Sequence, residues 1–295
     1  MRGRMQSVMV ASTLALISLL FPPVSIISSA TVALVTLRRG TSEGFWVLLC
    51  SSAAAAILGM LLFGGYQFAL FYGLVLWLPV WVIAIVLREA RHLSLAVEMA
   101  VLIGVLGVVF FYLFMDEPAT LWQVMLERMI GPMLKMHAEV SAVNIEQSLE
   151  VLAHYMTGIL AAASIYGLLF GLFLGRWWQA MLYNPGGFKQ EYLALKAHSA
   201  LTLASIGIIA VGWLGSGIVS EIAWNIALLL FALYALIGAA VLHRVFAAMK
   251  AGRFWVPMLY VTLLMIPHAM LPVALVGLSD AWLNLRNKFS KQPDA

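Results

Sequence analysis

The chain has 295 residues, of which 63% are hydrophobic and 10% are charged. This composition excludes a soluble domain of ordinary size, because the polar stretches between the apolar runs are too short to bury a core of their own. The basic residues behind the net charge of +4 lie in short loops, so they indicate contact with anionic lipid and not with nucleic acid. The single cysteine, Cys50, excludes an intrachain disulfide and a cysteine-based metal site.

Residues 7–37 form the first apolar run, and the pair Pro22-Pro23 divides it. Proline lacks a backbone N–H and clashes with the preceding turn, so this run predicts a broken helix, either a hairpin or one bent span. Its basic start and the small residues up to Ala30 also resemble a signal peptide. We expect no cleavage, because removal of this segment would leave Arg38 and Arg39 on the outer side, against the charge bias described below.

Six uninterrupted apolar runs can each cross a bilayer as one helix, because about 20 residues at about 1.5 Å per residue cover its hydrocarbon core. They are residues 45–64, 68–87, 94–115, 152–174, 201–219 and 222–242. The last run, 254–278, contains three prolines and is expected to bend or break. The sequence therefore predicts an all-α polytopic transmembrane helix bundle, with six clear spans and Pro-broken first and last segments, folded as one integral membrane domain over residues 1–295.

The Lys and Arg residues divide unequally between the two sides of these spans. If the first run enters and returns, the inner side receives twelve of them: Arg2, Arg4, Arg38, Arg39, Arg88, Arg91, Arg176, Lys189, Lys196, Arg244, Lys250 and Arg253. The outer side then receives Arg128 and Lys135. If the last run also returns, Arg286, Lys288 and Lys291 make the ratio fifteen to two, whereas a single crossing makes it twelve to five.

Basic residues gather in the cytoplasmic loops of membrane proteins. The division therefore predicts a multi-pass protein of the bacterial inner (cytoplasmic) membrane with a cytoplasmic N-terminus. It favours a hairpin for the first run and, less strongly, for the last, which would place the C-terminus in the cytoplasm as well.

The predicted outer segment, residues 116–150, carries six acidic and two basic residues. Leu121, Met125, Met129 and Met133 recur every four residues, and a second amphipathic piece is expected beyond Gly131-Pro132. Such a segment lies on the outer membrane face or folds over the mouth of the bundle. Methionines at helical spacing are typical of an adaptable apolar face, so we expect no metal site there.

Three polar residues inside or near apolar spans are candidates for substrate binding, because a polar group in hydrocarbon tends to face a cavity or a partner. His154 and Asn225 fall just inside the outer ends of their spans, with Glu221 at the boundary, so together they can line an outward-facing pocket. His268 follows Pro267, where a broken helix frees backbone carbonyls. The alternative is that water or these carbonyls satisfy the same side chains without any ligand.

The sequence lacks H-E-x-x-H, C-x-x-C, G-x-x-x-x-G-K-[ST] and G-x-S-x-G. Gly215-Ser216-Gly217 lies within a predicted span, where small residues usually form packing surfaces. We therefore expect no enzyme, no cofactor and no metal. Any ATP-driven energy would have to come from another chain.

The predicted inner loop, residues 176–198, contains aromatic residues suited to a membrane interface, followed by Asn-Pro-Gly-Gly, which predicts a tight turn. The candidate residues for docking a partner are Arg176, Trp178, Asn184, Pro185, Gly186, Gly187 and Phe188. Residues 188–196 follow the turn as a short amphipathic helix. The alternative is a connector that lies along the membrane.

This loop, read as R-x-W…N-P-G-G-F, and the closing G-L-x-D-x-x-x-x-x-R at residues 277–286 resemble the YybS-like family of uncharacterised bacterial membrane proteins. The resemblance implies the fold of the S components of energy-coupling-factor transporters, which bind a ligand from outside and dock an ATPase-driven module inside. The family has no established activity or binding residues to carry over. Within this stretch, Asp280 is expected to pair with Arg286 or to cap a helix.

Two functions follow from these patterns. The first is a small-molecule binding or transport component with a pocket near the outer face. Its partners would be the lipid bilayer, an unknown ligand and a partner protein such as an ATPase module at residues 176–196. The second is a non-transporting membrane scaffold or regulator that acts through the same loop.

Overall fold

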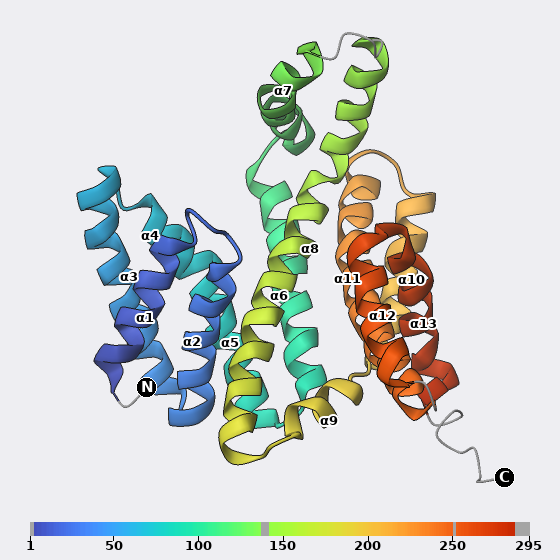
Figure 1. Ribbon diagram of the computed structural model, residues 1–295. Helices are drawn as coiled ribbons and strands as arrows, with labels where there is room; N and C mark the ends of the chain where they lie inside the picture. Colours follow the sequence, from blue (N-terminus) through green and yellow to red (C-terminus); the bar gives the residue numbers. More distant parts are fainter. Residues whose placement is uncertain (1–2, 137–141, 250–251, 287–295) are drawn as a thin grey trace, which may run out of the picture. The chain divides into compact units, whose positions relative to one another are not determined.

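The computed structural model describes residues 3–136, 142–249 and 252–286 (Figure 1). Over these residues every regular element is a helix, which confirms the predicted all-α fold. Five helical stretches are long and apolar enough to cross a membrane: Thr41–Leu62, Gln67–Ala90, Leu93–Phe114, Glu146–Tyr183 and Gly217–Ala248. They coincide with five of the six predicted runs, and the chain is an integral, multi-pass membrane protein.

The described chain divides into two compact units. Unit 1 comprises residues 1–100 and 165–196, and unit 2 comprises residues 101–164 and 197–295. Helices α6 (Leu93–Phe114) and α8 (Ala142–Tyr183) contribute residues to both units. The expectation of a single membrane domain stays a prediction, and each unit is described by itself.

Unit 1 begins with the first predicted run, which is broken as expected. Helix α1 (Arg4–Ile17) ends before the proline pair, and α2 (Val24–Arg39) follows and packs against it. The Ser28 hydroxyl donates to the Ala11 carbonyl at 2.8 Å and accepts from the Trp77 indole N–H at 3.1 Å. These buried bonds tie the two helices to the next layer of the unit.

That layer consists of α3 (Thr41–Phe63), α4 (Gln67–Phe71), a π-helical stretch η1 (Tyr72–Trp77) and α5 (Leu78–Ala90). The unit is completed by the second half of α8 and the short α9 (Gly187–Leu193). Gly171 and Gly175 of α8 face α2, because a Cβ on either would approach atoms of Ser29 or Ala30 to 2.8–2.9 Å. The small residues therefore form a packing surface, as expected for membrane helices.

Unit 2 contains α7 (Pro118–Met136), α10 (Ser199–Leu214), α11 (Gly217–Ala248), α12 (Gly252–Met265), η2 (Pro267–Ala269) and α13 (Met270–Leu283). The largely buried α11 is its central helix and packs against α10, α12 and α13. Gly238 of α11 and Gly277 of α13 meet so closely that a Cβ on either would collide with a backbone carbonyl of the other helix.

The last predicted run is broken, as expected, and the break lies at one of its three prolines. The segment 267–283 is bent by 118° from α12, whereas Pro257 lies inside α12. Asp280 is fully buried and pairs with Arg286 at 2.9 Å, which confirms the expected partner. Asn284 adopts the left-handed conformation (φ 48°) at the end of α13, where the chain turns before Arg286.

One predicted boundary is wrong. The run 201–219 is not one helix, because α10 ends at Leu214 and has only 16 residues. Gly215 and Ser216 are extended and Gly217 has a positive φ of 58°, so Gly215-Ser216-Gly217 forms a turn and not a packing surface inside a span. Helix α7 continues through Gly131-Pro132 to Met136, and the second piece expected beyond these residues begins with α8 at Ala142.

Candidate functional site

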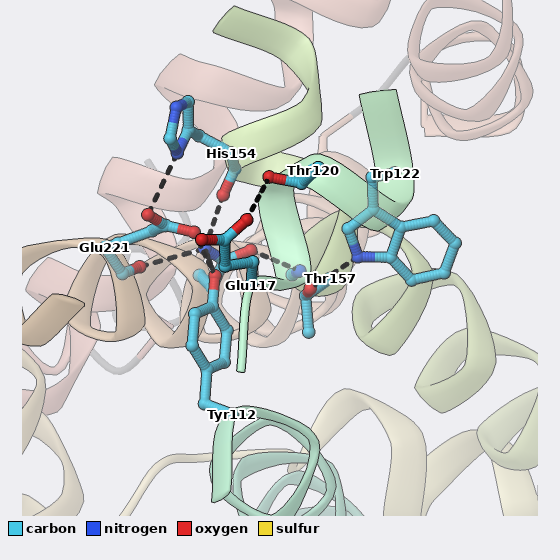
Figure 2. Close-up of polar contacts among 9 residues, drawn as sticks. Tyr112, Glu117, Thr120, Trp122, His154, Thr157 and Glu221 are labelled. Carbon is cyan, nitrogen blue, oxygen red and sulfur yellow. Dashed lines mark hydrogen bonds and ion pairs between the residues drawn. The ribbon is translucent and has the colours of Figure 1, made fainter. Parts of the chain in front are cut away.

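A polar network joins three helices within unit 2, near the end of α6 and the start of α11 (Figure 2). Its members are Tyr112 from α6, His154 from α8, and Glu221 and Asn225 from α11. Each helix is apolar around these positions, so hydrocarbon cannot satisfy the polar groups and they turn toward one another.

The Glu221 carboxylate is the centre of this network. The Tyr112 hydroxyl donates to its Oε1 at 2.7 Å, and its Oε2 lies 2.9 Å from the Nδ1 of His154. A carboxylate only accepts, so we assign the Nδ1 proton to His154, which leaves its Nε2 directed away from the carboxylate. The side chains of His154 and Glu221 are 46% and 20% exposed, so both reach the surface of the unit.

Asn225 is fully buried and all of its amide groups are engaged. Its Oδ1 accepts from the Gly158 backbone N–H at 2.6 Å, and its Nδ2 donates to the His154 carbonyl at 2.7 Å. Gly158 and His154 are four residues apart on α8, so the amide bridges a donor and an acceptor that normally pair along a helix. The same Nδ2 contacts the Tyr112 hydroxyl at 3.1 Å and the Glu221 carbonyl at 2.9 Å.

The close approach of α8 and α11 depends on Gly158. A Cβ at this position would lie 2.5 Å from the backbone oxygen of Asn225 and 2.8 Å from its Cα. A larger residue would separate the two helices and break the bridge. The missing side chain at Gly158 therefore lets the Asn225 amide come within hydrogen-bonding distance of the α8 backbone.

Helix α7 covers the start of α8 through a small apolar cluster of Leu126, Leu149 and Ala153, with Trp122 packed beside it. The Trp122 indole also donates to the Thr157 hydroxyl at 2.8 Å. The face of α7 that packs is therefore not the predicted methionine stripe. Met125 and Met129 are 44% and 75% exposed, and the side chain of Met133 lies outside the described residues.

A pocket of about 300 Å³ opens beside the network, and we call it the His154 pocket. Its lining residues are His154, Tyr155, Ser216, Gly217, Ser220, Glu221 and Trp224. Trp224 is held edge-on against Trp213 with their ring centres 5.8 Å apart, and the Ser220 hydroxyl donates to the Gly212 carbonyl at 2.7 Å. A lining that combines aromatic side chains with a few polar groups is typical of small-molecule sites.

A second, largely apolar pocket of about 880 Å³ shares Tyr155 with the first. Its other lining residues are Gln147, Ser148, Val151, Leu152, Ile159 and Leu228. In a membrane such a surface suits lipid chains or the apolar part of a ligand.

The structure brings two of the three predicted substrate-binding residues together. His154 lines the pocket, whereas Asn225 lies behind it as a positioning residue. His268 is exposed in η2, and within the described residues no hydrogen bond joins it to His154 or Asn225. Tyr112, Gly158 and Trp224 escaped prediction, because their roles arise from how the helices cross and each alone is an ordinary residue of an apolar helix.

The predicted docking loop in unit 1 is rigidly attached at its base. The Arg176 guanidinium forms a bidentate pair with Glu191 of α9, in which Nε donates to Oε2 at 2.9 Å, and its Nη1 donates to Gln179 at 3.0 Å. Phe188 and Tyr192 of α9 lie against Phe173, with ring centres 5.7 and 6.1 Å from it. These contacts fold α9 back onto α8.

The tip of the loop is a tight turn, as predicted. Gly186 has a positive φ of 87°, and the Gly187 N–H donates to the Asn184 carbonyl at 2.9 Å. Asn184, Pro185 and Gly186 are exposed, whereas Trp178 and Phe188 are partly buried and Gly187 is buried. Among the candidate docking residues, the three of the turn are therefore the ones open to a partner.

Comparison with known proteins gives no identification. No protein-family model matches the chain, and neither curated proteins nor solved structures contain a match. The resemblance to the YybS-like family therefore stays a prediction.

Proposed function

We propose that the chain is the small-molecule-binding component of a membrane transport system and that the His154 pocket holds its substrate. The observation that carries this proposal is the Glu221 carboxylate, which sits near the start of an apolar helix with both oxygens engaged and a pocket beside it. An ionisable group within an apolar helix that also borders a pocket is a candidate for ligand binding.

The pocket chemistry favours a ligand with a hydrogen-bond donor or a positive charge. Such a group can replace His154 at Oε2 of Glu221, while Tyr112 keeps Oε1 occupied. The ring of Trp224 offers a face for the adjoining part of the ligand, and aromatic faces attract cations. Ser216 and Ser220 add hydroxyls that can orient it.

The division of basic residues supports an orientation for this function. In a bacterial inner membrane with a cytoplasmic N-terminus, the His154 pocket opens to the outer side and the turn at Asn184 faces the cytoplasm. A partner such as an ATPase module would dock on that turn and supply energy. This arrangement agrees with the resemblance to the YybS-like family and with the S-component fold that it implies.

The test is mass spectrometry of small molecules that copurify with the full chain from native membranes in mild detergent. Wild type should retain a metabolite, and Glu221→Gln should lose at least about nine-tenths of it, because the charged acceptor for the ligand is gone. Thr202→Val is the control, since Thr202 is buried in α10 and its hydroxyl donates to the carbonyl of His198, the residue that caps the start of that helix. An empty wild-type pocket, or equal retention by Glu221→Gln, would contradict the proposal.

The second candidate is a scaffold or regulator that acts through the loop at residues 176–196. The observation that favours it is the rigid base of the loop with an exposed turn at its tip. The double variant Asn184→Ala, Gly186→Ala distinguishes the two functions. A binding component keeps its small molecule in detergent and loses uptake, whereas a scaffold loses a copurifying protein and has no small molecule to lose.

A further inference from the structure

A second polar pocket lies within unit 1, where α2 and α5 end and α8 approaches α9. Its volume is about 490 Å³, and we call it the arginine pocket. Its lining residues are Leu37, Leu87, Arg88, Glu89, Arg91, Arg176, Gln179 and Glu191. Three guanidinium groups face two carboxylates, so the lining carries a formal charge of +1. The pocket shares no residue with the His154 pocket.

Two of these arginines are fixed by neighbours within the unit. The Nη1 of Arg88 donates to the Leu37 carbonyl at 2.7 Å and contacts the Thr36 carbonyl at 3.4 Å, so it caps the end of α2. The Gln179 amide donates to the same Leu37 carbonyl at 3.2 Å. Arg176 is held by its bidentate pair with Glu191. Both cations are therefore positioned before any ligand arrives.

Arg91 differs from the other two. It ends α5 in the left-handed conformation, with φ 56°, which residues other than glycine rarely adopt. Its backbone N–H donates to the Leu87 carbonyl at 3.0 Å, but its side chain is exposed, and no hydrogen bond or ion pair joins the guanidinium to another described residue. The backbone thus presents a guanidinium with unused donors to the pocket.

Each of the two acids pairs with one of the other two arginines, which leaves the net charge of +1 on Arg91. Both oxygens of Glu191 are occupied by Arg176, and Glu89 lies 3.8 Å from Arg88. The planar guanidinium fork matches the oxygens of phosphate, and basic pockets at the ends of membrane helices suit anionic headgroups. The pocket also lies where the candidate span Gln67–Ala90 ends, at the level where headgroups are found.

We propose that the arginine pocket binds a phosphate group, with Arg91 as its main contact and Arg88 and Arg176 as the positioned charges behind it. The phosphate belongs to either an anionic lipid headgroup or a soluble phosphate compound. Both sources share the same chemistry at the pocket and differ in the rest of the molecule.

The test is a binding titration of the full chain in neutral detergent micelles with two probes, short-chain phosphatidylglycerol and inorganic phosphate. Short-chain phosphatidylcholine is the zwitterionic reference. Wild type should bind phosphatidylglycerol or phosphate in preference to phosphatidylcholine. Arg91→Gln should weaken that binding about tenfold or more, because a charge-assisted hydrogen bond is lost. Arg91→Lys keeps the positive charge but lacks the planar guanidinium donors, so its affinity should lie between those of wild type and Arg91→Gln.

Arg128→Gln is the matched control, because Arg128 is an exposed arginine of α7 in unit 2 and the substitution removes the same charge. It should bind as wild type does. Binding of phosphatidylglycerol alone identifies a lipid headgroup, whereas competition by inorganic phosphate identifies a soluble source. The proposal is overturned if wild type prefers neither probe to phosphatidylcholine, or if Arg91→Gln binds as tightly as Arg128→Gln.

Discussion

The two pockets are built from polar groups at helix ends, but the two units arrange them in opposite ways. In the His154 pocket a carboxylate is central, and Tyr112 and His154 approach it from two other helices. In the arginine pocket the cations predominate, and Arg88 and Arg176 are held by carbonyl and carboxylate oxygens. The sign of the charge left for a ligand is therefore negative in one unit and positive in the other.

The comparison also teaches how each site is held. The His154 pocket depends on two helices that touch at Gly158, so its geometry is a consequence of backbone packing. The arginine pocket depends on long side chains that cap the end of α2 and hold α9, so its geometry tolerates small backbone shifts. Substitutions at the glycine should therefore cost more than substitutions at the ion pairs.

The largest effect is expected for Gly158→Val. Its Cβ would meet the Asn225 backbone 2.5 Å away, so the helices must separate and unit 2 should lose about 3 kcal/mol of unfolding free energy. Thermal unfolding in detergent measures this loss. Gly167→Val on the same helix is the control, since a Cβ there has no atom within 4 Å. Equal melting temperatures for the two variants would show that the contact at Gly158 is not close.

Asn225→Leu should be the next most damaging change. The leucine is similar in size but leaves the His154 carbonyl and the buried Tyr112 hydroxyl without their amide donor, at an expected loss of about 2 kcal/mol. The same unfolding experiment measures it. The double variant with Gly158→Val should lose less than the sum of the single changes, because both break one bridge. Additive losses would mean that the two residues act independently.

Glu191→Gln tests the side-chain attachment in unit 1. The bidentate pair with Arg176 is partly exposed, so its loss should lower the unfolding free energy by about 1 kcal/mol and loosen α9. Hydrogen exchange of the α9 amides should accelerate while that of α11 does not change. Unchanged exchange in α9 would mean that Phe173, Phe188 and Tyr192 alone hold the helix.

Glu221→Gln should have the smallest effect on stability, a few tenths of a kcal/mol, because glutamine can still accept from Tyr112 and the site is partly exposed. Among these variants, Glu221→Gln should nevertheless cause the largest loss of the copurifying small molecule. Measuring both quantities on one preparation separates binding from folding. A loss of stability as large as that of Asn225→Leu would assign Glu221 a mainly structural role.

Hydropathy predicted five of the six uninterrupted spans, but it did not predict how the helices contact one another. The apolar runs predicted α3, α6 and most of α8 and α11, because about 20 apolar residues leave few alternatives to a membrane helix. The turn at Gly215-Ser216-Gly217 was missed, because small residues are common both in turns and in helix-packing surfaces. Local sequence does not distinguish these two uses.

The site was predicted in part. Polar residues near the ends of spans pointed to His154 and Asn225, and the structure places both of them beside Glu221. Tyr112 could not be found in this way because a tyrosine near the end of a span is typical of a membrane interface, and Gly158 could not because it carries no polar side chain. Their roles depend on which faces of α6, α8 and α11 meet, which is a property of tertiary packing.

The orientation that we propose has the His154 pocket open to the outer side of the membrane and the turn at Asn184 in the cytoplasm. Cysteine labelling tests it directly, in a Cys50→Ser background because Cys50 is exposed. Ser216 and Asn184 are exposed positions at the pocket and the turn. On intact spheroplasts a membrane-impermeant maleimide should label Ser216→Cys at once and Asn184→Cys only after permeabilisation. Labelling of Asn184→Cys from outside, with Ser216→Cys protected, would contradict the account.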